Sequence, residues 1–188
     1  MHILARSRRI LHGYVVGFQR AWYRRVWGMH IGEGVRISLS CKLDKTNPKG
    51  ITIGDYTAVT FGVAILSHDY VNRRHLATKI GSHCFIGCNS IIMPGVTIGD
   101  HCIVGAGSVV MRDVPSHSVV TGNPGRVLER DIETLAYGVR ISAAIPSELA
   151  AHEAAKAARA VPASDQGPAS GQGPLPEQGP VSEQKESA

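Results

Sequence analysis

The 188-residue chain has few aromatic residues, few cysteines and no long apolar run. Aromatic residues make up 5% of the chain and hydrophobic residues 43%, so any core must be built from aliphatic side chains. The absence of a run of about 18 apolar residues argues against a transmembrane helix. The 4 cysteines are too few for a disulfide framework in a chain of this length. We therefore expect a reducing compartment and a cytoplasmic protein, at the inner face of the membrane if the basic N-terminus touches lipid.

Positive charge is concentrated in the first residues of the chain, although the formal net charge is only +5. Residues 1–30 contain no acidic residue, and residues 129–188 are acidic overall. The N-terminal arginines are Arg6, Arg8, Arg9, Arg20, Arg24 and Arg25. This distribution favours anionic partners for the N-terminus and the middle of the chain, such as phosphates, phospholipid headgroups or acidic sugars.

A six-residue repeat organises the middle of the chain. Each block begins with an aliphatic residue, and its fifth position is small or slender. The first positions are Ile80, Ile86, Ile92, Ile98, Val104 and Val110, and the fifth positions are Cys84, Ser90, Val96, Cys102, Ser108 and Val114. Ile53, Val59 and Ile65 continue the pattern backwards, as do Ile31, Ile37 and Leu43. Neither a helical period of 3.6 nor strict alternation explains this spacing.

Three blocks of six residues close one triangular coil if each block forms a flat side. Each aliphatic residue then stacks on the residue eighteen positions away, so Ile80 lies over Ile98 and Ile86 over Val104. Neighbouring coils pair as parallel strands about 4.8 Å apart. Because a coil buries its inward side chains only against its neighbours, both ends of such a stack need caps.

Two insertions interrupt the repeat. The first, residues 49–52, shifts the phase before Ile53. The second, residues 71–79, lies between two blocks that are in phase and contains Arg73, Arg74, His75 and Lys79. Solenoids tolerate insertions as loops on one face, often the binding face, so we expect the loop 71–79 to shape a binding site.

The two ends of the chain differ from the repeat. Residues 10–29 have helical spacing of Leu11, Tyr14, Val15, Phe18, Trp22, Val26 and Met29. This pattern predicts a helix that caps the first coil, and equally a basic amphipathic helix at a membrane surface. We divide the chain into this helix (residues 1–30), the repeat domain (31–128), a helical segment (129–161) and a disordered Gly/Pro/Gln-rich tail (162–188).

The blocks from Ile80 to Val114, followed by the segment Val119–Leu128 with its Gly-Asn-Pro-Gly-Arg sequence, resemble the hexapeptide-repeat acyltransferase superfamily. The chain is most similar to galactoside, maltose and polysaccharide-modifying O-acetyltransferases. The resemblance implies an all-β fold, a left-handed parallel β-helix that forms a homotrimer with active sites between subunits. It also implies acetyl-CoA as the donor, no metal, a small-molecule or glycan acceptor, and no nucleic-acid partner.

Acyl transfer from a thioester to a hydroxyl requires a base that removes the alcohol proton. Histidine suits this task because its reference pKa of about 6.5 lies near working pH. The resemblance places the base at His68, directly before the inserted loop. We expect the carboxylate of Asp69 to orient the ring, and Asp44 or Asn47 of the first coil is the alternative orienting group. On the acceptor side we expect Asp44, Asn47, Arg73 and Arg74.

The resemblance also implies a donor site built from backbone and cations. Glycines let the pantetheine arm approach the coil without a Cβ in the way, and cations suit the CoA phosphates. The residues that match this pattern are Phe85, Gly87, Cys88, Ala106, Gly107, Arg112 and Arg126. Met111 stands where the family often has Thr or Ser.

Several alternatives stay open from the sequence. A catalytically silent scaffold in surface-glycan assembly needs no acetyl-CoA, and an acyl-enzyme on Cys88 is conceivable. A zinc enzyme like the γ-type carbonic anhydrases needs three histidine ligands, but the short spacing of that family is absent. His83-Cys84 and His101-Cys102 also suggest four zinc ligands. Adjacent residues of a strand point to opposite sides, however, so one ion cannot reach all four side chains.

Overall fold

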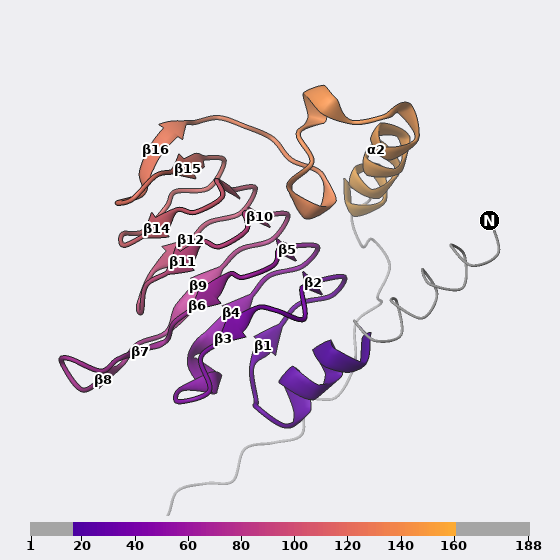
Figure 1. Cartoon of the computed structure of the whole chain (residues 1–188). Coiled ribbons are helices and arrows are strands. Elements are labelled where there is room, and N and C mark those ends of the chain that lie inside the picture. Colours follow the sequence, from indigo (N-terminus) through magenta and orange to yellow (C-terminus); the bar gives the residue numbers. More distant parts are fainter. Residues whose placement is uncertain (1–16, 161–188) are drawn as a thin grey trace, which may run out of the picture.

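The computed structural model describes residues 17–160, so the expectations for residues 1–16 and for the tail 162–188 lie outside the described residues. The repeat region forms a left-handed parallel β-helix with three flat faces (Figure 1). Each coil contributes one short strand to each face. Among residues 17–160, no helix is both long enough and apolar enough to span a bilayer.

The strands of the solenoid form three sheets, here named A, B and C. Sheet A contains β1 (His30–Ile31), β4 (Ile51–Ile53), β9 (Thr78–Ile80) and β12 (Thr97–Ile98). Sheet B contains β2 (Arg36–Ile37), β5 (Ala58–Val59), β10 (Phe85–Ile86), β13 (Ile103–Val104), β15 (Val119–Thr121) and β16 (Arg126–Glu129). Sheet C contains β3 (Lys42–Leu43), β6 (Ala64–Ile65), β11 (Ile91–Ile92) and β14 (Val109–Val110).

The register confirms the eighteen-residue coil. Ile80 lies opposite Ile98, and Ile86 lies opposite Val104, in parallel pairs. Both predicted columns point inward, since every first-position and fifth-position residue from Ile80 to Val114 is buried. The aliphatic column forms the core because each coil removes the apolar surface of its neighbour from water.

The two phase shifts also appear in the register. Ile31 lies opposite Ile53, and Ile53 lies opposite Ile80, so each of these coils is longer than eighteen residues. The first shift is taken up by a loop that includes the short 3-10 helix η1 (Pro48–Gly50). The last coil is two residues shorter, with Val104 opposite Val120, which the sequence pattern did not predict.

The second insertion is a β-hairpin whose bounds differ from the expected loop 71–79. It begins at β7 (His68–Asp69), which pairs antiparallel with β8 (Arg74–His75). Thr78 is already buried in β9, and Lys79 lies in that strand. The hairpin projects from the body of the solenoid at the lower left of Figure 1. Lys79 therefore belongs to the coil, because its neighbours Thr78 and Ile80 are both buried in the interior of the solenoid.

The N-terminal helix, residues 17–25, caps the first coil with a different face from the one expected. Phe18, Trp22 and Val26 are 70%, 48% and 56% exposed. The residues that pack on the core are Tyr23 and Trp27, which are partly buried against it. Of the expected stripe, Met29 is buried in the core, Phe18, Trp22 and Val26 are exposed, and the members before residue 17 lie outside the described residues. The turn after the helix therefore completes the cap through Trp27 and Met29.

A hairpin of β15 and β16 closes the other end of the solenoid. The chain then returns along the sheet B side as an irregular segment, residues 131–143, which we call the C-terminal strap. It contains the 3-10 turns η2 (Ala136–Gly138) and η3 (Ile141–Ala143), and only α2 (Pro146–Ala160) is a regular helix. The expected helical segment 129–161 is thus helical only in its second half. Buried Ile132 and Leu135 fix the strap to the solenoid.

A column of stacked rings supports the strap at the corner between sheets A and B. Successive ring centroids lie 5.7, 5.0 and 4.9 Å apart in the column Tyr56, His83, His101 and His117. His101 Nδ1 lies 2.9 Å from the carbonyl oxygen of Thr134, and His117 Nδ1 lies 2.9 Å from that of Ile132. The imidazoles therefore bond the strap to successive coils.

Candidate active site

His68 lies where the chain leaves the solenoid. β6 of sheet C ends at Ile65, and after two intervening residues β7 begins the projecting hairpin. The side chain of His68 is 27% exposed, so one part of the ring is held by the protein and another faces solvent. The imidazole thus occupies the corner between sheets C and A, at the base of the hairpin.

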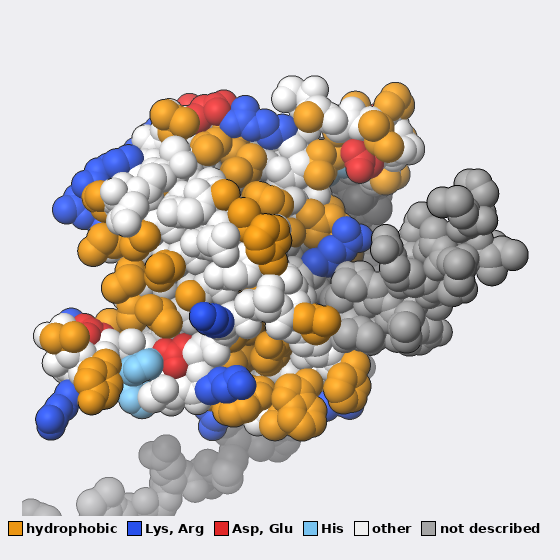
Figure 2. All heavy atoms as spheres, viewed as in Figure 1, with side chains coloured by type: hydrophobic (Ala, Val, Ile, Leu, Met, Phe, Trp, Pro, Cys, Tyr) orange, Lys and Arg blue, Asp and Glu red, His pale blue; other side chains and the backbone are white. Residues whose placement is uncertain are grey.

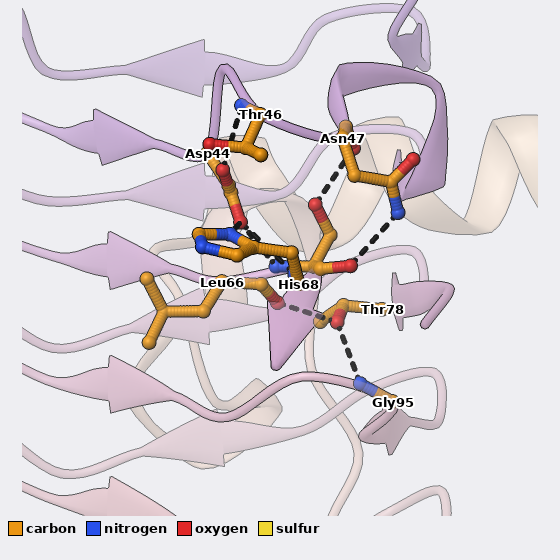
Figure 3. A network of polar contacts seen from close by, with 8 residues as sticks. Asp44, Thr46, Asn47, Leu66, His68, Thr78 and Gly95 are labelled. Atoms are coloured by element: carbon orange, nitrogen blue, oxygen red, sulfur yellow. Dashed lines mark hydrogen bonds and ion pairs between the residues drawn. The ribbon is translucent and has the colours of Figure 1, made fainter. Parts of the chain in front are cut away.

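Asp44, in the preceding coil, holds the ring of His68 (Figure 3). Asp44 Oδ2 lies 2.5 Å from His68 Nδ1 and also accepts the backbone N–H of His68 at 3.0 Å. An ionised carboxylate can only accept hydrogen bonds, so Nδ1 must carry the ring proton. This tautomer leaves the lone pair on Nε2, on the other side of the ring, available to accept a proton.

The Asp44 carboxylate is kept ionised by its neighbours. Burial raises the pKa of this carboxyl, but bonds from His68, Ser67 and Thr46 outweigh burial and hold the pKa well below its usual range. The backbone N–H groups of Ser67 and Thr46 donate to Asp44 at 2.9 and 2.8 Å. A charge that would be costly to bury is therefore satisfied by donors fixed in the backbone.

A second set of bonds fixes the backbone just before His68 (Figure 3). Asn47 Nδ2 donates to the carbonyl of Ser67 at 2.8 Å, and Ser67 Oγ donates to the carbonyl of Asn47 at 2.7 Å. Thr78 Oγ1 donates to the carbonyl of Leu66 at 2.6 Å. Asn47 therefore holds the backbone just before His68 through its Nδ2, and its expected place on the acceptor side stays a prediction.

Asp44, and not Asp69, contacts the ring of His68. Asp69 caps the hairpin turn, where it accepts the backbone N–H and side-chain amide of Asn72 at 3.0 and 2.6 Å. The side-chain bond from Asn72 is the largest cause that lowers the pKa of Asp69. The expectation that Asp69 orients the imidazole was wrong, because successive strand residues face opposite sides and Asp44 occupies the position beside the ring.

The hairpin carries the cationic side chains expected at the acceptor site. Arg73 and Arg74 are exposed, and Arg74 Nη2 lies 3.7 Å from Asp69 Oδ2. His75 is the cross-strand partner of His68. Directly opposite residues of an antiparallel pair share one face, so the side chain of His75 lies on the same face of the hairpin as that of His68.

The expected donor residues do not lie together in the fold. Cys88, Ala106 and Gly107 lie at the corner between sheets B and C, where the backbone N–H of Gly107 donates to the carbonyl of Cys88 at 2.8 Å. Gly107 has a φ of +68°, and a Cβ there would meet nothing within 4 Å. This open, left-handed glycine is compatible with close approach of a ligand, but it lies at the opposite edge of sheet C from His68.

Two of the expected donor residues have other surroundings. A Cβ at Gly87 would lie 2.6 Å from the backbone of Val104 and Ala106, so coil stacking explains this glycine. Phe85 lies in sheet B beneath the C-terminal strap, where a Cβ on Gly138 would come within 2.3 Å of the Phe85 Cβ. The structure thus gives Gly87 a role in coil stacking and places Phe85 against the strap, and the contact of either residue with the donor stays a prediction.

The two arginines of the donor pattern are both exposed, in different places. Arg112 follows β14 as His68 follows β6, so it lies at the same corner of the solenoid. Arg126 begins β16 at the closing hairpin, and its Nη1 donates to the carbonyl of Gly125 at 3.0 Å. Arg112 therefore shares an edge with His68, whereas Arg126 lies at the end of the stack.

Within residues 17–160 the structure contains no cluster of three or more potential metal ligands. Cys84 and Cys102 point into the core, while the rings of His83 and His101 stack outside with centroids 5.0 Å apart. The two pairs therefore face opposite sides of the coil wall, as alternation along a strand requires.

Comparisons with known proteins agree with this fold. The family model for bacterial transferase hexapeptide repeats matches residues 77–112. The putative acetyltransferase YvoF of Bacillus subtilis (strain 168) is 35% identical over 115 residues, which cover 60% of this chain and 67% of that protein. The protein CapG of Staphylococcus aureus is 37% identical over 116 residues, which cover 56% of this chain and 67% of that protein.

A similar solved structure is that of the hexapeptide-repeat-containing acetyltransferase VCA0836 from Vibrio cholerae O1 biovar eltor, in complex with acetyl-CoA. It is 29% identical, with a TM-score of 0.45, and the match covers 58% of this chain and 74% of that chain. The register, the matched repeat model and the identity to YvoF lead to one conclusion. The chain belongs to the hexapeptide-repeat superfamily of acyltransferases.

Proposed function

We propose that the protein transfers an acetyl group from acetyl-CoA to a hydroxyl of a sugar, in a glycan or polysaccharide precursor. The observation that carries this proposal is the bond between His68 Nδ1 and the ionised Asp44, which leaves Nε2 as a base facing solvent. The exposed Arg73 and Arg74 beside it favour an acceptor that carries negative charge.

In the proposed reaction, His68 Nε2 removes the proton of the acceptor hydroxyl while its oxygen attacks. Acetyl-CoA supplies a thioester carbonyl carbon, at which a C–O bond forms and the C–S bond breaks. Asp44 stabilises the imidazolium that forms, as a buried carboxylate does for a catalytic histidine. The imidazolium then returns the proton to the leaving sulfur, so that His68 ends the cycle as it began.

We propose direct transfer between the two bound substrates. Cys88 lies at the corner between sheets B and C, and the structure joins His68 to a different corner. A thiol needs a nearby base to act as a nucleophile at neutral pH. The separation of Cys88 from the imidazole therefore supports a mechanism without an acyl-enzyme.

We also propose a homotrimer with its active sites between protomers. Three exposed apolar side chains support this proposal, because they lie on sheet C or at its corners: Phe61, Ile91 and Met111. A partner subunit on this face would remove these apolar side chains from water. Contact along this face would bring the open Gly107 of one protomer toward the His68 corner of another. Sedimentation equilibrium tests the trimer, and a monomeric mass would exclude it.

The function is tested by incubating the protein with acetyl-CoA and a panel of sugars, nucleotide sugars and glycans. Thiol release gives the rate, and mass spectrometry identifies the acetylated product. We expect His68→Ala to lower turnover by roughly 10²- to 10⁴-fold, the usual contribution of a general base. The matched control is His30→Ala, since His30 is an exposed histidine of sheet A.

The outcomes separate the enzyme from a silent scaffold. An enzyme must bind acetyl-CoA, with nearly unchanged affinity in His68→Ala, whereas a scaffold need not bind it. Near-normal turnover in His68→Ala would remove this residue from the mechanism. Failure to bind acetyl-CoA, measured by calorimetry, would leave the scaffold as the function.

A further inference from the structure

The N-terminal helix presents an apolar face to solvent. We call Phe18, Trp22, Arg25 and Val26 the outer helix face. Side chains three or four positions apart are neighbours on a helix, so Trp22 lies beside Phe18 and Arg25. Val26 follows the last helical residue and continues the helical bonding through its N–H, which donates to the carbonyl of Trp22 at 2.9 Å. The rings of Phe18 and Trp22 lie with centroids 6.2 Å apart. Figure 2 shows hydrophobic side chains gathered over this helix, at the lower end of the molecule.

This exposed face is not a by-product of the capping function. The opposite side of the helix already packs on the solenoid through Tyr23, and the following turn packs through Trp27. Lys45 Nζ lies 5.4 Å from the centre of the Trp27 ring, over its face. The helix therefore has one apolar side that is used by the fold and a second that the fold leaves in water.

The charge around the outer helix face is positive. Arg25 lies on this face and is exposed. Arg20 and Arg24 share a single carboxylate, Glu33, at 3.8 and 2.9 Å. The sequence has no acidic residue before Glu33. Cations therefore outnumber acids around the exposed aromatic rings, which favours an anionic surface and disfavours an identical copy with the same charge.

We propose that the outer helix face docks the protein on the surface of a bilayer that contains anionic lipids. The helix lies in the plane of the headgroups, with Phe18, Trp22 and Val26 at the level of the acyl boundary and Arg25 among the phosphates. Tryptophan, phenylalanine and arginine on one helix face are the residues that suit this depth. Docking itself does not depend on acetyl transfer, whereas its consequence for the acceptor rests on the proposed function.

The docked orientation has a consequence for the acceptor. The N-terminal helix and the β7–β8 hairpin both lie toward the first-coil end of the solenoid (Figure 1). Docking through the outer helix face therefore brings the hairpin close to the bilayer, where an acceptor linked to a lipid is presented. The position of the helix favours such an acceptor over a freely diffusing one.

The test measures binding of the full chain to vesicles. Sedimentation with vesicles of phosphatidylcholine containing phosphatidylserine is compared with sedimentation with phosphatidylcholine alone. We expect Phe18→Ser with Trp22→Ser to lower the partition coefficient by roughly tenfold or more. Arg25→Gln lowers it roughly fivefold on the anionic vesicles only. The control is Leu128→Ser, since Leu128 is 74% exposed on β16 at the other end of the solenoid.

A second measurement reports the contact directly. The chain has 2 tryptophans, so Trp27→Phe leaves Trp22 as the sole tryptophan. Vesicles of brominated phosphatidylcholine with phosphatidylserine are expected to quench its emission, and circular dichroism checks that each variant is folded. Equal binding of the wild-type chain to both vesicle types overturns the proposal. Unchanged vesicle binding of the double variant also overturns it. If the double variant changes only the mass of the protein in sedimentation, the outer helix face binds a second copy of the chain instead.

Discussion

The most informative single substitution is Asp44→Asn, because it changes the charge beside His68 with little change in shape. Asp44 accepts four hydrogen bonds: from the backbone N–H of Thr46, of Ser67 and of His68, and from the His68 ring. An asparagine can keep its oxygen at the position of Oδ2, which serves three of them. Its NH₂ group then faces the N–H of Thr46, a donor opposite a donor.

The size of the effect follows from these bonds. A hydrogen bond to a charged group contributes about 1 kcal/mol more than one to a neutral group. The four bonds to Asp44 therefore lose about 4 kcal/mol together when the charge is removed. Relief of the cost of burying the charge offsets about half of this sum. We therefore expect the free energy of unfolding to fall by about 2 kcal/mol at pH 7. Turnover should fall roughly 10²-fold, because the imidazolium loses its anionic partner.

The loss of stability should depend on pH. In the unfolded chain the pKa of this carboxyl is its ordinary value of about 3.8, and the pKa of the folded Asp44 is lowered well beneath this. Below about pH 4 the unfolded chain therefore binds a proton that the folded chain does not bind. The stabilisation by Asp44 is fully present above about pH 5 and declines as the pH falls through the acidic range. The variant lacks this contribution.

The assay combines urea unfolding at pH 7, 5 and 3 with turnover at pH 7. The difference in unfolding free energy between wild type and Asp44→Asn should shrink toward pH 3. In the His68→Ala background, Asp44→Asn should cost no further activity, since the two groups act as a unit. Wild-type turnover together with a pH-independent difference in stability would refute the assigned role of Asp44.

The remaining predictions concern the solenoid and its strap. Gly87→Ala should destabilise the protein by more than about 2 kcal/mol, because its Cβ would lie 2.6 Å from the backbone of the next coil. Gly107→Ala should cost only about 1 kcal/mol for its left-handed φ, and urea unfolding compares the two. Ile92→Ala, at a fully buried position, should cost about 2–5 kcal/mol in the same assay. Tyr137→Ala removes a ring that lies 3.7 Å from the Arg36 guanidinium, and should speed hydrogen exchange in the strap while β-helix amides stay protected.

The sequence by itself determined the solenoid and the position of the imidazole. An aliphatic residue at every sixth position, with a small residue four positions later, has one packing solution, and Ile80 does lie on Ile98. The interruption after His68 marked the place where the chain leaves the coil. These features are readable because they depend on a short period and on local chain geometry.

Only the tertiary structure decided which groups meet at the corners and faces. Asp44 reaches His68 because the extra residues of the first coil align Leu43 with Ile65, so Asp44 stands beside the start of the hairpin. The phase shift was visible in the sequence, but the side to which each carboxylate points depends on the path of the loop. Asp69 was the wrong choice for that reason.

The same holds for the surfaces that the chain covers or leaves open. Phe85 lies against a strap that follows it by about fifty residues, and Trp22 is exposed while Trp27 packs on the first coil. A periodic apolar stripe predicts a helix and its apolar face. It does not say whether that face meets the solenoid, because the direction in which the helix enters the first coil is fixed by the turn that follows it.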